Sequence, residues 1–487
     1  MKKKSISTYT IIAFGISICC LLGFPWIKLM KVSAFINANI KFHNTIRRSI
    51  IDGSGNVRLF DPFKYENLYV AKANYDSLLL DNQLIFEQVP DEEAISSISI
   101  RHHIRRALQV WKHLPVSQQV SFRNFLEYIL PYRSGAEPWS DYSTVITRRY
   151  SGILDSMVNR RDPVEAASRI NKELKTWLTF DLRSHAELNE PSILEILDSK
   201  HGSCNSLAQF ATQACRALGV PTAIDECPYW AHRNSGHAWS VVLDTTGKWI
   251  PFSAADKNPY DFMPINDSVK APKILRRVYS GNPAFQPPHE SISELPPLFR
   301  SSTYLDVTPE YVSTSEVMVC PDSAICSGRS VLYLAVFNAE QWCIVAWTEI
   351  RKGKAKFTLL GNDSIVYLPV WYELGQAKPA APPFLLTHEK TIPIVTDTAS
   401  RQSVCLPLYN RFFGGEWEIG HPEPNCEMEL LFWKNGWETA GKSVPDLNGN
   451  LNFAGVPSNS LYLLRFSDRA NTWQRIFQIY NGEQVWY

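Results

Sequence analysis

Residues 200–205, KHGSCN, open the stretch that decides the fold, and SGHAW (235–239) and GKWIPFSAAD (247–256) complete it. After the first motif, apolar residues recur at helical spacing. They are Leu207, Phe210, Ala211, Ala214, Cys215 and Leu218. Gly219 and Pro221 then supply the signals that end a helix. The pattern predicts an amphipathic helix whose first turn contains Cys204 on the apolar side.

A cysteine at the start of a helix has a specific chemical advantage. The positive end of the helix dipole stabilises a thiolate there, and the thiolate is the nucleophilic form. We therefore interpret Cys204 as a candidate nucleophile, and Cys215, three turns further along, as a core residue. Backbone N–H groups at the helix start are suited to stabilise an oxyanion, so the flanking Ser203 and Asn205 are candidate cleft residues.

The second and third motifs predict a β-hairpin. Residues 237–243 alternate as a strand does, Gly247 suits a tight loop, and residues 249–253 return alongside. Counting back from the loop places His237 opposite Ala254 or Ala255, with Asp256 as the carboxylate in reach. An imidazole oriented by a carboxylate and facing a thiolate is the arrangement of Cys-His-Asp acyl transfer.

The motifs resemble the transglutaminase-like superfamily across residues 162–285. They are GSCN around Cys204, RALGVP at 216–221, GHAW at 236–239 and GKWIP at 247–251. The resemblance implies a papain-like core with a Cys-His-Asp triad, in which Cys204 is the nucleophile and His237 the base. The position usual for the family's acid is Ser253 here, so Asp256 serves only if the chain bends near residues 251–255. Trp239 and Ser253 are further cleft candidates.

The whole chain reads as an α+β protein of several domains. Its 487 residues are too many for one core, and the formal net charge of +1 argues against a nucleic-acid binder. Helical periodicity fills the N-terminal region, whereas strand-length runs and turns after about residue 287 predict all-β domains, in the form of sandwiches. The expected parts are a leader or anchor (1–34), a helical region (35–161), the core (162–285) and two β-rich domains (286–400 and 401–487).

The first residues favour export. Three lysines at positions 2–4 precede a stretch without charge from Ser5 to Ile27, as in a secretory signal peptide or an N-terminal membrane anchor. Export places the protein in the periplasm or at the cell surface, where Cys320 and Cys326 either close a small disulfide loop or remain two thiols. Cleavage, lipidation and anchoring stay open, and any membrane contact is expected through this segment alone.

Two functions fit these observations. The first is an exported cysteine enzyme that acts on amide or peptide bonds of a protein, peptide or peptide-like substrate, with hydrolysis favoured over cross-linking and no cofactor. The second is a weak or inactive transglutaminase-like surface protein that binds peptide or glycan. A metal site made of Cys204, Cys215, Cys227, His232 and His237 is disfavoured, because their spacing matches no compact zinc pattern.

Overall fold

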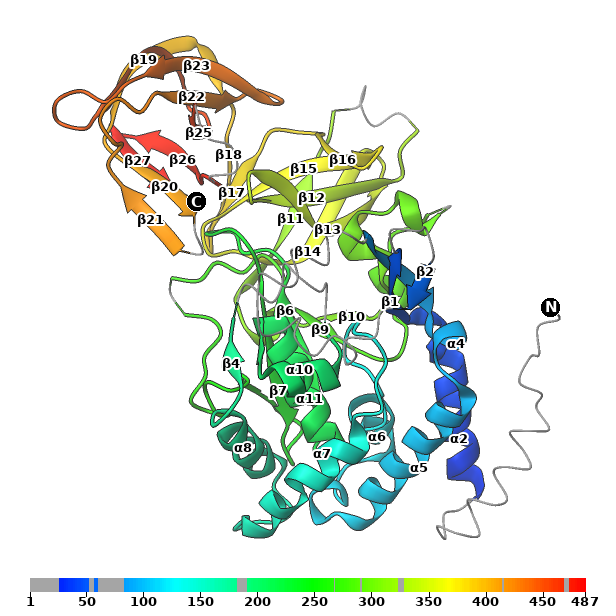
Figure 1. Ribbon diagram of the computed structural model, residues 1–487. Coiled ribbons are helices and arrows are strands. Elements are labelled where there is room, and N and C mark those ends of the chain that lie inside the picture. Colours follow the sequence, from blue (N-terminus) through cyan, green and yellow to red (C-terminus); the bar gives the residue numbers. More distant parts are fainter. Residues whose placement is uncertain are drawn as a thin grey trace. The chain divides into compact units, whose positions relative to one another are not determined.

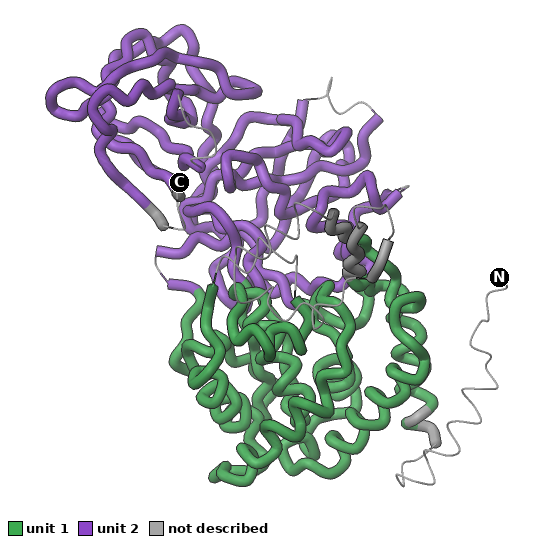
Figure 2. Tube along the Cα trace, viewed as in Figure 1, with its two compact units in different colours: residues 1–225, 238–264, 277–281 green, residues 226–237, 265–276, 282–487 purple. Residues whose placement is uncertain are grey.

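The structure is a computed structural model that divides into two compact units (Figure 2). Unit 1 comprises residues 1–225, 238–264 and 277–281, and unit 2 comprises residues 226–237, 265–276 and 282–487. Not every residue is described. The described residues are 26–51, 57–59, 83–181, 191–266, 268–289, 291–322, 328–413, 416–467 and 473–487.

Helices form most of unit 1 (Figure 1). They are α2 (Trp26–Asn39), α4 (Asp91–Ala94), α5 (Ser97–His113), α6 (Phe122–Tyr128), α7 (Ser143–Tyr150), α8 (Pro163–Leu174), α10 (Ile193–Ser199) and α11 (Cys204–Ala217). Capping residues in the sequence mark where α8 and α10 begin and where α11 ends. Asp162 caps α8 by accepting a hydrogen bond from the N–H of Val164, and Ser192 with Glu195 forms a capping box at α10. Gly219 takes a positive φ of 79° after α11, as a helix-ending glycine does.

The N-terminal region is helical from residue 91 onward, but residues 44–90 also contribute a sheet that the periodicity did not predict. Its strands are β1 (Asn44–Ile51), β2 (Val57–Leu59) and β3 (Gln83–Pro90), in the order β2-β1-β3. The run Asn44–Ile51 contains four β-branched residues, which favour a strand, and its partner β3 lies more than thirty positions further along the chain. This pairing is non-local, so a reading of local periodicity misses it.

A five-stranded sheet contains the strands of the second and third motifs, in the order β10-β9-β6-β7-β8. The strands are β6 (Thr222–Cys227), β7 (His237–Leu243), β8 (Trp249–Phe252), β9 (Leu275–Arg277) and β10 (Tyr304–Asp306). The predicted hairpin is confirmed: Ser240 pairs with Phe252 and Leu243 with Trp249, and Gly247 has a φ of 92° in the loop. Two short strands, β4 (Thr179–Phe180) and β5 (His201–Gly202), pair in parallel just before α11.

The larger sheet of unit 2 has the order β11-β14-β13-β12-β15-β17-β18, with β16 paired to β15. Its strands are β11 (Thr314–Val319), β12 (Val331–Asn338), β13 (Gln341–Arg351), β14 (Lys354–Gly361), β15 (Ile365–Glu373), β16 (Gln376–Pro379), β17 (Phe384–Leu386) and β18 (Thr391–Pro393). Leu332 and Leu334 point into one buried cluster and Tyr333 and Ala335 into another. Both faces of β12 are therefore covered, as expected for a layered β-structure.

The C-terminal strands form smaller antiparallel sheets, including one of order β23-β22-β25-β26-β27. The strands are β19 (Asp397–Leu406), β20 (Tyr409–Phe413), β21 (Glu416–Gly420), β22 (Met428–Trp433), β23 (Trp437–Ser443), β24 (Leu451–Ser458), β25 (Tyr462–Phe466), β26 (Ile476–Tyr480) and β27 (Glu483–Trp486). The predicted Asn481-Gly482 hairpin turn is confirmed, because both residues have positive φ. A shared hydrophobic cluster joins Phe337 of β12 to Leu463 and Ile476, so the two β-rich parts of unit 2 pack together.

Two expectations fall largely on residues that the structure does not describe. Residues 1–25, which contain most of the predicted leader or anchor, lie outside the described residues, as does Cys326. Cys320 has an exposed free thiol. Within the described part of the chain, no helix combines the length and the apolar character needed to cross a membrane.

Candidate active site

Cys204 is the first residue of α11, where the sequence predicted it. Ser203 caps the helix: its Oγ accepts a hydrogen bond from the N–H of Ser206 at 3.2 Å. Ser203 and Asn205 are buried, whereas Cys204 is only half-buried. The thiol thus lies on the first turn of a capped fourteen-residue helix, whose dipole favours the thiolate.

The chain approaches α11 through a close passage that requires glycine. A Cβ atom on Gly202 would lie 2.8 Å from the Cβ of Ser206 in the first turn of the helix. The same glycine pairs with Phe180 in the short β4–β5 ladder. Gly202 is therefore held between the first turn of α11 and strand β4, and this fixes the backbone that leads into Cys204.

The helix that begins at Cys204 packs on the strand that begins at His237. Ser240 Oγ donates to the backbone oxygen of Ala208 at 3.2 Å, and Ala208 and Ala238 share a small buried cluster. Ala208 is one helical turn after Cys204, and Ala238 directly follows His237. Ala238 and Ser240 therefore hold the start of β7 on α11, and His237 is the residue directly before this contact.

His237 is the first residue of β7 and is half-buried. Burial and, to a smaller extent, the positive charge of Arg233 lower the pKa of His237 to about 4. The imidazole is therefore neutral at neutral pH, which is the form that can accept a proton from a thiol. Trp239, two residues along the strand, is fully buried, so its indole serves the core more than an open cleft.

Asp256 lies in a tight turn that follows β8, so the chain does bend after this strand. The N–H of Ser253 donates to the oxygen of Lys257 at 2.9 Å, and Ala255 has a φ of 57°. Asp256 is exposed, and within the described part of the chain its carboxylate has neither a hydrogen bond nor an ion pair. Ser253 is half-buried, and extending the β7–β8 register places it opposite Trp239.

Asn171 of α8 holds this turn, and the sequence analysis did not identify it. The residue is fully buried, and its Oδ1 accepts a hydrogen bond from the N–H of Ala255 at 2.8 Å. Its Nδ2 lies 3.2 Å from the oxygen of Ser253 and 3.1 Å from that of Lys257. The available signal was a polar side chain next to Ile170 on an otherwise apolar helix face.

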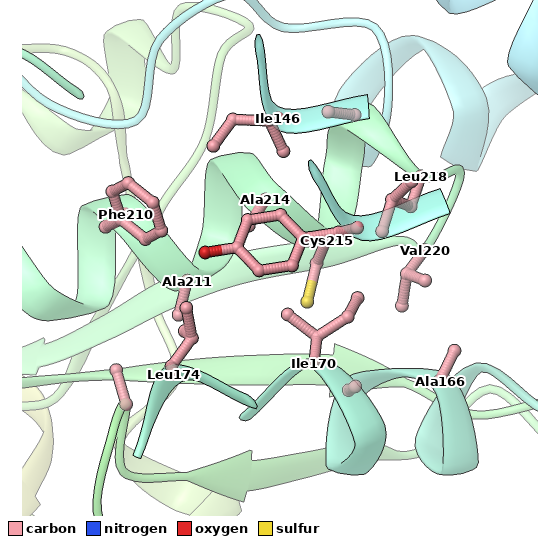
Figure 3. Packing of buried hydrophobic residues seen from close by; sticks show 14 of the residues in the cluster. Ile146, Ala166, Ile170, Leu174, Phe210, Ala211, Ala214, Cys215, Leu218 and Val220 are labelled. Atoms are coloured by element: carbon pink, nitrogen blue, oxygen red, sulfur yellow. The ribbon is translucent and has the colours of Figure 1, made fainter. Parts of the chain in front are cut away.

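Cys215 is a core residue, as predicted. Figure 3 shows its sulfur among apolar side chains that include Ile170, Ala211 and Leu218. Burial raises the pKa of this thiol far above its ordinary range, so it is unreactive at neutral pH. Among the residues that the structure describes, no three His, Cys, Asp or Glu side chains gather in a way that could hold a metal ion.

Comparison with known families identifies the segment that holds the helix and the hairpin. The family model described as "Transglutaminase-like superfamily" matches residues 153–254. The chain contains a transglutaminase-like domain. The matched segment begins before the predicted start at residue 162, and it includes Cys204 and His237 but ends before Asp256.

Two solved structures show a distant likeness to this chain. One is described as "a Putative Cysteine Protease from Cytophaga hutchinsonii", with 18% identity over 24% of this chain and 39% of that chain and a TM-score of 0.20. Red sea bream transglutaminase has 11% identity over 81% of this chain and 74% of that chain and a TM-score of 0.17. No curated protein matches the sequence.

Proposed function

We propose that the transglutaminase-like domain is a cysteine acyl-transfer site that acts on amide or peptide bonds, with Cys204 as nucleophile and His237 as base. The observation that supports this most is the packing of Ala208 against Ala238, because these residues lie one helical turn after Cys204 and one position after His237. The proposal requires the imidazole to lie at the open end of β7, beside the first turn of α11.

The reaction follows from the chemistry of these two groups. Neutral His237 accepts the proton of the Cys204 thiol as the sulfur forms a bond to the substrate carbonyl carbon. Backbone N–H groups at the start of α11 stabilise the oxyanion of the tetrahedral intermediate. His237 then donates the proton to the departing amine as the C–N bond breaks, and a thioester remains. Water or a second amine then attacks the thioester carbonyl and gives its proton to His237. The C–S bond breaks, the proton returns to the Cys204 sulfur, and the acyl group leaves as a carboxylic acid or a new amide.

Asp256 is the proposed orienting acid, and its exposure limits what it contributes. A carboxylate in water stabilises an imidazolium less than a buried one, because the solvent screens the charge. Ser253, at the position usual for the family's acid, has no charge to offer. We therefore expect a slower enzyme than one with a buried triad acid. We favour hydrolysis over cross-linking as the fate of the thioester.

A second candidate function is binding without efficient catalysis. The exposed and unpartnered carboxylate of Asp256 favours it, because a site without an orienting acid can keep its fold and lose its rate. In that case the chain binds peptide or glycan at a cell surface.

A fluorogenic peptide library assayed for both hydrolysis and amine incorporation tests the proposal. Turnover of any peptide that is abolished in Cys204→Ala and retained in Cys215→Ala supports the enzyme. Binding of peptides without turnover supports the second function, and turnover that survives in Cys204→Ala contradicts the first.

We also infer that the protein is exported, from the basic and then uncharged sequence of residues 2–27. Fractionation of cells that express the full chain tests this inference. Recovery in the cytoplasm at full mass would contradict it, whereas recovery in an exported or membrane-bound fraction supports it.

A further inference from the structure

The loop between β6 and β7 leads directly into His237, and a side chain from a distant strand holds its backbone. Asn338 ends β12 and is buried. Its Nδ2 lies 2.9 Å from the backbone oxygen of Trp230 and 3.0 Å from those of Arg233 and Ser235. Its Oδ1 accepts a hydrogen bond from the N–H of Ser235 at 2.9 Å. One amide side chain thus contacts four backbone groups of the loop, with the two N–H groups of Nδ2 shared among three oxygens.

Arg475 makes a second set of bonds to the same loop. The residue is fully buried, and its Nη2 donates to the oxygen of Ala231 at 2.5 Å. Its Nη1 donates to the oxygen of Phe337 at 2.8 Å and lies 3.2 Å from Oδ1 of Asn234. Its Nε donates to the backbone oxygen of Tyr487 at 3.0 Å. The guanidinium therefore ties the loop both to the end of β12 and to the last strands of the chain.

Further contacts restrict the backbone of this loop close to β7. Asn234 also donates through Nδ2 to the oxygen of Trp473 at 2.7 Å and accepts from the N–H of Ala339 at 2.8 Å. A Cβ atom on Gly236 would lie 2.3 Å from the oxygen of Pro228, so the residue directly before His237 runs tightly along the start of its own loop. The backbone that enters β7 is fixed at several points.

We propose that Asn338 and Arg475 are positioning residues for His237, so that the β-rich part of the chain is required to place the base of the site. This inference rests on the proposed function for the role of His237, whereas the contacts themselves all lie within unit 2. A purely structural reading assigns the same bonds to fold stability alone. The two readings differ in whether the imidazole changes when the loop is released.

Substitution of Asn338, with Asn362 as the matched control, distinguishes a positioning role from a purely structural one. Asn338→Ala leaves buried backbone groups of the loop unsatisfied. Asn362→Ala removes an equally buried amide near the same sheet, whose Nδ2 donates to Ser315 Oγ at 2.8 Å and not to the loop. In the full chain, NMR titration of labelled histidines, assigned with His237→Gln, reports the ring of His237. Alkylation of Cys204 by iodoacetamide, followed by mass spectrometry, reports the thiol.

We expect Asn338→Ala to raise the pKa of His237 by at least one unit, because a released loop admits water to the ring. We also expect Cys204 alkylation at pH 7 to slow at least tenfold, because the released ring is no longer held where it can take the proton of the thiol. Asn362→Ala should change neither. Equal His237 titrations in the two variants would overturn the inference. If Asn338→Ala does not fold, two substitutions of Arg475 supply the same comparison. Arg475→Lys keeps a cationic donor and Arg475→Met removes it. A shift of the His237 pKa in Arg475→Met but not in Arg475→Lys supports the inference, and an unchanged pKa in both overturns it.

The titration also separates this inference from the proposed function. If Cys204 of the wild-type protein is no more reactive than an ordinary thiol, the proposed function fails. The shift of the His237 titration in Asn338→Ala remains measurable in that case and still decides the positioning role.

Discussion

Oδ1 of Asn171 accepts a hydrogen bond from the backbone N–H of Ala255 at 2.8 Å, and this bond fixes the left-handed residue of the turn that presents Asp256. Asn171→Ala would leave the partly buried N–H of Ala255 without its partner, which costs at most about 1–3 kcal/mol. We expect a loss of stability of that size, measured by denaturant unfolding of the full chain. Turnover should also fall, because the turn is released.

Asn171→Asp provides the control for this prediction. It keeps an acceptor for Ala255, loses the donor bonds to Ser253, Lys257 and Asn258, and buries a carboxyl group. Activity that it retains beyond that of Asn171→Ala therefore reports the bond to Ala255. Equal activity in all three proteins would show that the turn has no part in the reaction.

Asp256→Asn should lower turnover roughly ten- to a hundredfold. Removal of a buried triad acid costs about 10⁴-fold, and the exposure of Asp256 predicts a smaller effect. Asp261→Asn, a nearby exposed carboxylate, is the matched control and should leave the rate unchanged. If steady-state kinetics show the same rate for both variants and the wild type, Asp256 has no role as the acid.

Stability should fall as the pH is lowered from about 6.5 toward 4. Burial lowers the pKa of His103 and of His237 to about 4, and that of His43 and of His232 to about 3. Below pH 6.5 the unfolded chain binds protons at these residues and the folded chain does not, so the free energy of unfolding decreases. Each histidine contributes on the order of 1.4 kcal/mol per pH unit in this window.

Thermal unfolding at pH 7, 5.5 and 4.5 measures this dependence. On α5, His103 is buried and its Nε2 donates to the backbone oxygen of Leu130 at 2.7 Å, whereas His113 is exposed. His103→Gln should show a shallower pH dependence than the wild type, and His113→Gln should not. Identical slopes in all three proteins would contradict the assignment.

Local signals made much of the site-bearing fold predictable. The cap at Asp162, the apolar stripe after Cys204 and the turn at Gly247 each specify an element from adjacent residues, and the structure has all three. The sheet of β1 and β3 was not predictable in this way, because its pairing joins segments far apart in the chain.

The residues that hold the backbone around the site could not be predicted from the sequence, also because their contacts are non-local. Asn171 reaches a turn more than eighty positions away, and Asn338 reaches a loop more than a hundred positions away. Nothing adjacent to either asparagine indicates its partner. Cys204 and His237 could be proposed because each lies within a motif whose neighbours define a helix start or a strand.

The central claim is that the Cys204 thiol and the His237 imidazole act together. Reaction of the purified protein with a thiol-directed acyl probe, read by intact mass and peptide mapping, tests it in the wild type, Cys204→Ala, Cys215→Ala and His237→Gln. We predict an adduct on Cys204 alone that is retained in Cys215→Ala and forms at least a hundredfold more slowly in His237→Gln. An unchanged rate in His237→Gln, or labelling that survives in Cys204→Ala, would contradict the account.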